Sequence, residues 1–346
     1  MGLPVGEILD IIAEPRRQRP RPARFRLMPG AFEARRGGHC HPMRTAFSPA
    51  RPLVAAQCAL QWLARLWPSP ETTAGVAPEL VSASARKPLT APTDLPDPRA
   101  AWSDRLWGAG FTLPGGEAEV LHLARLLPLS AATTLLLVGR DAGGAAGCLA
   151  GRYRSWIATY QHDARLVARM TPLLRPLGRR TVVQPWTPAT PRFRDRYHHH
   201  ALGLEPLHSG AAPDRLCQAV ASALKPGGQL VLVETVASSA RPVPGLARWL
   251  ELDGRASPPP SRGMVESALQ TAGFTVHVIE VLDMRQAVAV TDAWLQLLVG
   301  LRQGARPAST TEAAALVTEA ERWLLWQRLL QSGDLVVLRW HATLPG

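Results

Sequence analysis

A glycine-rich turn directly after an apolar run is the part of this sequence best suited to hold an anionic ligand. The run Leu135–Val138 ends in Gly139, and Gly143 and Gly144 then open a segment of helical composition. A turn of small residues lets backbone N–H groups approach a ligand, and these groups lie at the N-terminus of the helix that follows. Asp141 lies inside the turn and brings a side chain and a negative charge to it. The turn is therefore a predicted ligand-binding loop with an acidic residue at its centre.

Three adjacent histidines are the second concentration of chemically active side chains. On a strand, His198 and His200 share one face and His199 takes the other, so at most two of them converge. A metal would need a third ligand such as His208 or Glu205, and nothing in the spacing supplies one. We predict no metal site and interpret the three as partly buried histidines at a strand end. If one of them acts, its role is that of a general base toward a substrate heteroatom near neutral pH.

The elements that must position these side chains alternate between strands and helices. Apolar β-type runs predict strands at 135–138, 156–160, 181–183, 197–205, 229–233, 274–281 and 335–340. Helical spacing predicts helices at 164–176, 213–224, 262–272, 290–303 and 311–331. The alternation predicts an α/β fold: a doubly wound, Rossmann-like, mostly parallel sheet with helices on both faces. The last two helices form a predicted helical insertion at 290–331 whose tryptophans belong to the core.

Charge and composition divide the chain into two regions. Residues 1–52 hold ten arginines and four acids, a net charge of +6, while the remaining residues carry 29 basic and 23 acidic side chains, also +6. We predict an Arg/Pro-rich N-terminal extension over 1–100 with one amphipathic helix at 53–67, and a main domain over 101–346. A basic arm favours anionic partners, but Phe25 and Phe32 are too few for stacking on nucleic acid. The arm is interpreted as a basic tail that could engage a protein partner.

The cysteines and the apolar runs bear on compartment. Four cysteines lie far apart with no CxxC spacing, so we expect a reducing compartment rather than a disulfide framework. His39-Cys40-His41 is the one metal-like cluster, and neighbouring positions rarely all point at one ion. No apolar run approaches the roughly 20 residues that span a bilayer. The expectation is a cytoplasmic, soluble protein with no membrane span.

Four motifs in residues 101–346 carry a resemblance to a known family. They are LLLVGRDAGG at 135–144, the second strand ending at 161–163, LKPGGQLVL at 224–232, and LWGAGF at 106–111 with Pro114-Gly115-Gly116. Together they resemble the class I S-adenosylmethionine-dependent methyltransferases, and the last motif is similar to the segment before the first strand of phosphoethanolamine and sarcosine N-methyltransferases. The resemblance implies S-adenosylmethionine as cofactor.

The resemblance also assigns cofactor-binding positions. It implies that the methionyl end lies over Gly139, Gly143 and Gly144, close to Asp141, with the ribose at Gln161 and the adenine at Trp186. Asp163 could replace Gln161 at the ribose or could cap the helix at 164–176. Methyl transfer needs mainly positioning of a lone pair in line with the methyl group, and no catalytic residue is identified.

The sequence departs from the family pattern at three positions. Leu137 stands where an acid normally precedes the turn, Asp141 replaces its middle glycine, and the neutral Gln161 replaces the ribose-binding acid. Two functions follow. The first is S-adenosylmethionine-dependent methyl transfer to a small-molecule acceptor, with weakened cofactor binding, and the retained glycines favour it. The alternative is an inactive methyltransferase-like domain that serves as a binding or scaffold protein.

Overall fold

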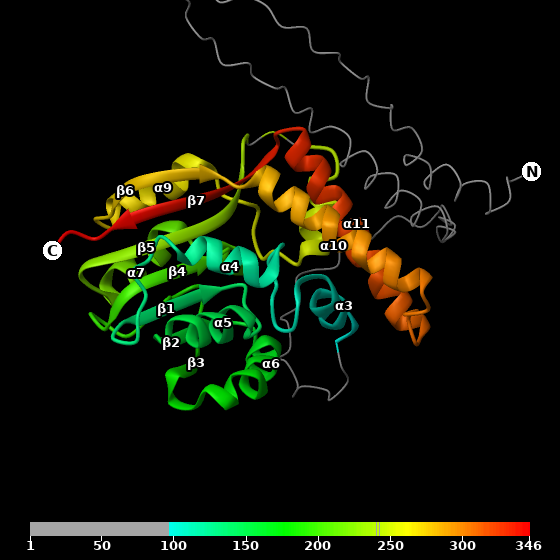
Figure 1. The fold of residues 1–346 in the computed structure, drawn as a ribbon. Coiled ribbons are helices and arrows are strands. Elements are labelled where there is room, and N and C mark those ends of the chain that lie inside the picture. Colours follow the sequence, from blue (N-terminus) through cyan, green and yellow to red (C-terminus); the bar gives the residue numbers. More distant parts are fainter. Residues whose placement is uncertain (1–96, 240, 242) are drawn as a thin grey trace, which may run out of the picture. The chain divides into compact units, whose positions relative to one another are not determined.

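The computed structural model describes residues 97–239, 241 and 243–346. Within them, seven strands form one sheet in the order β3-β2-β1-β4-β5-β7-β6 (Figure 1). The strands are β1 (Thr134–Gly139), β2 (Trp156–Gln161), β3 (Thr181–Pro185), β4 (His198–Leu204), β5 (Leu224–Ala237), β6 (Thr275–Val281) and β7 (Leu335–Thr343). The first five pair in parallel, and β7 runs antiparallel between β5 and β6. The predicted doubly wound, mostly parallel α/β sheet is confirmed.

Helices cover both faces of this sheet (Figure 1). They are α3 (Pro98–Trp107), α4 (Gly116–Ala124), α5 (Gly144–Tyr153), α6 (Ala164–Leu174), α7 (Pro213–Ala223), α8 (Leu246–Asp253), α9 (Arg262–Thr271), α10 (Asp283–Arg302) and α11 (Thr310–Gln331), with 3₁₀ turns η1 (Arg175–Arg180) and η2 (Pro206–Ser209). Strand β1 shows why two layers are needed. Leu135 and Leu137 belong to the core under α3–α5, α10 and α11, whereas Leu136 and Val138 belong to the core under α7 and α9.

The helical insertion before the last strand differs in its boundary from the prediction. Helix α10 begins at Asp283, directly after β6, rather than at 290. The Asp283 carboxylate accepts a hydrogen bond from the backbone N–H of Val337 at 2.6 Å, which ties the start of the helix to β7. Trp294, Trp323 and Trp326 are buried in the core that α10 and α11 share.

Several predictions lie outside the described residues or concern absences. Residues 1–96 of the extension predicted over 1–100, with its helix at 53–67 and the cluster at residues 39–41, lie outside the described residues. Among the helices that the structure describes, none combines the length and apolar character needed to cross a bilayer.

Candidate functional site

Asp141 turns back onto the helix that the glycine turn begins. The turn joins β1 to α5, and its Asp141 carboxylate accepts hydrogen bonds from the N–H groups of Ala145 at 2.9 Å and Ala146 at 3.2 Å. Only 2% of the residue is exposed. Burial raises the pKa of Asp141 to about 6, although several backbone N–H groups, those of Ala145 and Ala146 first, act in the opposite direction. The anion at this helix N-terminus is therefore a side chain of the chain itself.

The segment before β1 occupies the other donors of the turn. The carbonyl oxygen of Gly110 accepts hydrogen bonds from the N–H groups of Ala142 at 3.1 Å and Gly144 at 3.0 Å. The approach is so close that a Cβ on Gly144 would lie 2.7 Å from the Gly110 carbonyl carbon and from the Phe111 nitrogen. Gly110 is itself held by its N–H, which donates to Asp104 Oδ1 at 2.9 Å. The backbone of Gly110–Phe111 thus lies directly on the turn.

Gln161 uses its whole side-chain amide inside the protein. Its Nε2 donates to the carbonyl oxygens of Gly139 and Asp141, both at 3.0 Å, and its Oε1 accepts from the N–H groups of His162 at 2.9 Å and Asp163 at 3.1 Å. Two donors and two acceptor lone pairs are the full capacity of a glutamine amide. With 1% exposure, Gln161 fastens the turn to the end of β2 and leaves no polar atom for a ribose.

Asp163 takes the second of the two roles that the sequence left open for it, and Trp186 is a core residue. The Asp163 side chain accepts from the N–H of Arg165 at 2.8 Å and is the N-cap of α6. Trp186 is 7% exposed and belongs to the core, where its ring centroid lies 5.9 Å from that of Phe193 and 5.8 Å from that of His162. The tryptophan fills this region with its own aromatic ring.

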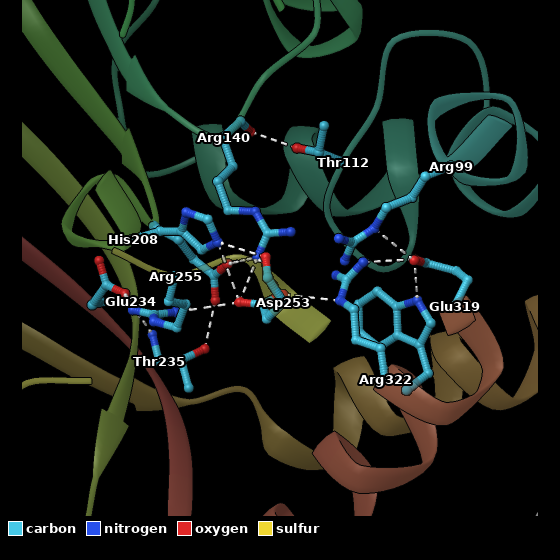
Figure 2. Close-up of polar contacts among 12 residues, drawn as sticks. Arg99, Thr112, Arg140, His208, Glu234, Thr235, Asp253, Arg255, Glu319 and Arg322 are labelled. Carbon is cyan, nitrogen blue, oxygen red and sulfur yellow. Dashed lines mark hydrogen bonds and ion pairs between the residues drawn. The ribbon is translucent and has the colours of Figure 1, made fainter. Parts of the chain in front are cut away.

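Arg140, next to Asp141, enters a buried network of ion pairs at the C-terminal ends of β1, β4 and β5 (Figure 2). Its Nη1 contacts Glu205 Oε2 at 2.9 Å and Asp253 Oδ1 at 3.2 Å. The guanidinium points inward, toward these two carboxylates. Its own carbonyl oxygen accepts from the Thr112 hydroxyl at 2.6 Å, which joins the network to the segment before β1.

Asp253 is the centre of the network (Figure 2). Besides Arg140, its carboxylate contacts Arg322 Nε at 2.9 Å and His208 Nε2 at 3.3 Å. Burial alone would raise the pKa of Asp253, but Arg140 and Arg322 hold it well below its usual range. Asp253 ends α8, so it connects that helix to the glycine turn and to α11.

Three further ion pairs extend the network in two directions. Glu234 on β5 contacts Arg255 at 2.8 Å, and burial raises the pKa of Glu234 to about 7 despite this arginine. On the other side, Glu319 contacts Arg322 at 2.6 Å and Arg99 of α3 at 3.1 Å. The network thus spans the space between the sheet, α3, α8 and α11.

Little open space remains in this network. A cavity bounded by Arg140, Glu205, Asp253 and Arg322 on its polar side, and by Trp249, Trp323 and Trp326 on its aromatic side, measures about 10 Å³. One water molecule needs roughly 10–15 Å³ measured in this way. The site can hold a single water and is too small for an organic substrate.

The three histidines of β4 do not converge on a ligand. Burial lowers the pKa of His198 and of His200 to about 4, so both rings are neutral near pH 7. His199 faces the other side, where its Nδ1 accepts from the N–H of Thr134 at 3.0 Å and its Nε2 lies 3.0 Å from Lys225 Nζ. Across residues 97–346 as described, no three His, Cys, Asp or Glu side chains are placed to hold a metal ion.

Sequence reasoning missed Gly110 and Asp253 as site residues. Gly110 belongs to a motif that carried the resemblance, but its carbonyl contact with the turn depends on how α3 packs. Asp253 lies on α8, a helix of eight residues that was not predicted. The signal available in the sequence was an aspartate directly before Gly254 and Arg255, and it is weak.

Comparison with known proteins identifies the class of the fold. No family model matches the chain, and no curated protein matches it. Among solved structures, phosphoethanolamine N-methyltransferase 2 of Haemonchus contortus, in complex with phosphomonomethylethanolamine and S-adenosylhomocysteine, matches with a TM-score of 0.63 and 15% identity over 70% of this chain and 57% of that one. A second structure of that enzyme, with S-adenosyl-L-methionine, is covered to 62%. This chain therefore spans about three fifths of the enzyme's length.

Two further structures are covered over a larger share of their own length. A putative sarcosine dimethylglycine methyltransferase from Galdieria sulphuraria matches with a TM-score of 0.58 and 15% identity, over 72% of this chain and 99% of that one. Geranyl diphosphate C-methyltransferase from Streptomyces coelicolor A3(2) matches with a TM-score of 0.52 and 14% identity over 65% and 76%. The main domain has the fold of the class I S-adenosylmethionine-dependent methyltransferases. Within that class, its neighbours include the phosphoethanolamine and sarcosine types that the sequence resembles.

The described residues do not fit S-adenosylmethionine as they stand. At the position that the resemblance assigns to the methionyl end, the N–H groups of Ala142, Gly144, Ala145 and Ala146 already have acceptors within the chain. At the position that it assigns to the ribose the Gln161 amide is fully used, and at the one that it assigns to the adenine Trp186 is part of the core. A cofactor could bind only after the chain had released these groups.

Proposed function

We propose that the main domain is a non-catalytic member of the methyltransferase fold, which serves as a binding or scaffold module. One observation carries the proposal: the donors of the glycine turn are bonded to the chain itself, to the Asp141 carboxylate and the Gly110 carbonyl. Binding of S-adenosylmethionine at the turn would require the loss of these bonds. It would also bury the carboxylate of the cofactor beside that of Asp141. Like charges placed in one site disfavour ionisation of both.

The closed network around Asp253 supports the same proposal. It lies at the C-terminal edge of the sheet, where ligands bind in open α/β folds. Arginines and carboxylates fill that edge and are paired with one another. A buried group of this kind stabilises one conformation and offers neither a free base nor a free nucleophile.

Isothermal calorimetry of the full chain with S-adenosylhomocysteine tests the proposal. We expect no heat of binding at ligand concentrations up to about 1 mM, a limit that corresponds to roughly −4 kcal/mol. The double variant Asp141→Gly, Gln161→Asp restores the family's residues and serves as the positive control. A dissociation constant of about 10 µM or lower for the unmodified chain, roughly −7 kcal/mol, would contradict the proposal.

A second candidate is S-adenosylmethionine-dependent methyl transfer to a small molecule, and one observation favours it. The segment that lies on the turn is bounded by Gly108 and Gly115, both at positive φ (96° and 85°), so a change of backbone conformation at its two ends could withdraw it. The structures from H. contortus and S. coelicolor contain S-adenosylmethionine or S-adenosylhomocysteine. This candidate requires weak binding in the same titration and stronger binding by Asp141→Gly alone.

A further inference from the structure

Positive charge is concentrated in one part of the main domain. Residues 142–194 hold nine arginines and one acid, Asp163, a net charge of +8. The other residues of 97–346 hold 17 basic and 19 acidic side chains, a net charge of −2. The positive and negative charges are therefore distributed unevenly over the domain, although its total net charge is moderate.

Five of these arginines come together where α5 ends and η1 leads into the edge strand β3. Arg152 and Arg154 lie at the end of α5, and η1, which contacts α5, β2 and β3, contributes the other three. Arg180 donates a hydrogen bond to the carbonyl oxygen of Arg154, which joins the two groups. We call this surface the arginine corner; its members are Arg152, Arg154, Arg175, Arg179 and Arg180.

No acid neutralises the arginine corner. Among the described residues, none of its five guanidiniums forms an ion pair; of the other arginines of residues 142–194, only Arg169 pairs with a carboxylate, that of Asp104. The nearest acid in the sequence, Asp163, is engaged at the N-terminus of α6. Four of the five arginines are exposed, and Arg180 is partly exposed. Uncompensated cations at this density attract an anionic surface.

Two large apolar side chains are exposed at the same edge of the sheet, on the face opposite to α5 and η1. Trp156 is 43% exposed and Val182 is 46% exposed. Val182 is the register partner of Ala158, so Trp156 and Val182 lie on the same face of neighbouring strands. The Arg180 guanidinium lies 5.3 Å from the centre of the Trp156 ring. Arg180 is the member of the arginine corner that contacts this apolar pair, so charge and apolar area meet at the sheet edge through Arg180.

We propose that the arginine corner binds the surface of an anionic phospholipid membrane. Exposed apolar side chains enter the headgroup region while arginines contact lipid phosphates, and attachment gains from both. Single-stranded nucleic acid is the weaker fit, because stacking needs several aromatic side chains and Trp156 is the one aromatic residue classed as exposed between residues 97 and 346. The basic residues 1–52 of the same chain add a second attraction, and stable attachment generally needs two signals.

Co-sedimentation of the full chain with vesicles tests the proposal. The probes are phosphatidylcholine vesicles with and without about 30% phosphatidylglycerol, at about 50 mM and about 500 mM NaCl. We expect binding to the anionic vesicles alone, and its loss at high salt. The variant Arg152→Glu, Arg175→Glu, Arg179→Glu should bind at least about 100-fold more weakly, since each arginine near an anionic leaflet contributes about fivefold. Among the described residues, these three side chains form no hydrogen bond or ion pair. The melting temperature of the variant should therefore equal that of the unmodified chain.

The matched control reverses three exposed arginines of the α10–α11 hairpin. Arg302→Glu, Arg306→Glu, Arg328→Glu changes the net charge equally and should weaken binding by less than about threefold, since screening limits remote charges. Equal losses in the two variants would show a net-charge effect and overturn the assignment. Three other results would also overturn the assignment: equal binding to neutral and anionic vesicles, no binding to either kind of vesicle, or unchanged binding by the variant Arg152→Glu, Arg175→Glu, Arg179→Glu. Corner-dependent binding of a single-stranded RNA without vesicle binding would replace the lipid by a nucleic acid.

Discussion

Asp141 and Asp253 resemble one another as residues: each is a buried carboxylate surrounded by groups that favour an anion. For Asp141 these groups are backbone N–H donors, and for Asp253 they are Arg140, Arg322 and His208. Their pKa values move in opposite directions, because full positive charges offset the cost of burial for Asp253 and N–H dipoles do not for Asp141. The two residues therefore make opposite contributions to the pH dependence of stability.

Ionisation of Asp141 lowers the free energy of unfolding as pH rises. An unfolded aspartate has a pKa near 4, and the pKa of the folded residue is about 6. Between these values the folded protein holds a proton that the unfolded chain has lost, so the free energy of unfolding falls as pH increases through this window. We expect Asp141→Asn to gain about 1–3 kcal/mol relative to the unmodified chain between pH 4 and pH 7. Urea unfolding of both proteins at the two pH values measures this, and an equal difference at both would refute it.

Asp253 supports the network by pairing several cations at once. Replacing it by alanine leaves Arg140 and Arg322 buried without this partner, and removal of one member of a buried ion pair costs about 3–5 kcal/mol. We expect Asp253→Ala to lower the free energy of unfolding by that amount, measured in urea. Glu251→Ala is the matched control on the same helix; its carboxylate is exposed and pairs with exposed Arg248, so its effect should stay within about 0.5 kcal/mol. Equal effects would show that the network contributes no more than a surface pair.

Of the site residues named from the sequence, Gln161 contacts the glycine turn, and its role depended on side-chain direction. Gln161 follows β2 as predicted, yet its amide turns toward Gly139 and Asp141, which no linear pattern reveals. For Asp163, the sequence left two roles open, and the contact with Arg165 N–H identifies the cap. Position along the chain was predictable because strands end where apolar runs end. The choice of hydrogen-bond partner was not, because it depends on neighbours distant in sequence.

Among the elements, the segment between α3 and α4 decides whether the turn is open. It is tied down by Gly110, whose N–H and C=O are both engaged, and by the Thr112 hydroxyl. A Cβ at Gly110 would lie 2.7 Å from the Gly144 nitrogen and 2.9 Å from Leu173 Cδ1, at a φ of +78°. Any side chain here must push the segment off the turn.

Gly110→Ala is therefore expected to expose the N–H groups of Ala142 and Gly144. Their hydrogen exchange, measured by NMR or mass spectrometry, should accelerate at least about tenfold, which is a loss of about 1.4 kcal/mol in local protection. Gly178→Ala is the control for backbone strain, since Gly178 also has a positive φ, +58°, but no atom lies within 4 Å of its added Cβ. Acceleration by both variants at Ala142 and Gly144 would mean that global destabilisation, rather than the local contact, causes it.

The strands were easier to predict than the helices. Runs such as Leu135–Val138 are buried on both faces and read as strands without tertiary information. Helices α3, α4 and α8 were missed because they are short, with 10, 9 and 8 residues. Trp102 and Trp107 of α3 are buried through contacts with α11, more than 200 residues later in the chain. Such helices owe their stability to packing rather than to periodicity.

At the scale of the whole molecule, the two ends of the sheet differ in character. The β3 end is the basic one, with the arginine corner beside the edge strand. The β6 end carries exposed apolar side chains, Val278, Ile279 and Val281 among them. The paired charges of the network lie between these ends, at the strands β1, β4 and β5. The exposed arginines that make the β3 end basic are thus separate from the buried ion pairs of the network.

The placement of β7 has a consequence for how the chain is made. Within the described residues, β7 is the only hydrogen-bonded neighbour of β6, and it follows β6 in the sequence only after α10 and α11. At synthesis rates of about 5–20 residues per second, β6 leaves the ribosome roughly 3–10 s before β7 does. During that interval β5 and β6 both present unpaired backbone groups to the same missing strand. Closure of the sheet must therefore await the synthesis of β7, and a nascent chain halted before β7 carries two open edges that chaperones or other chains can pair with.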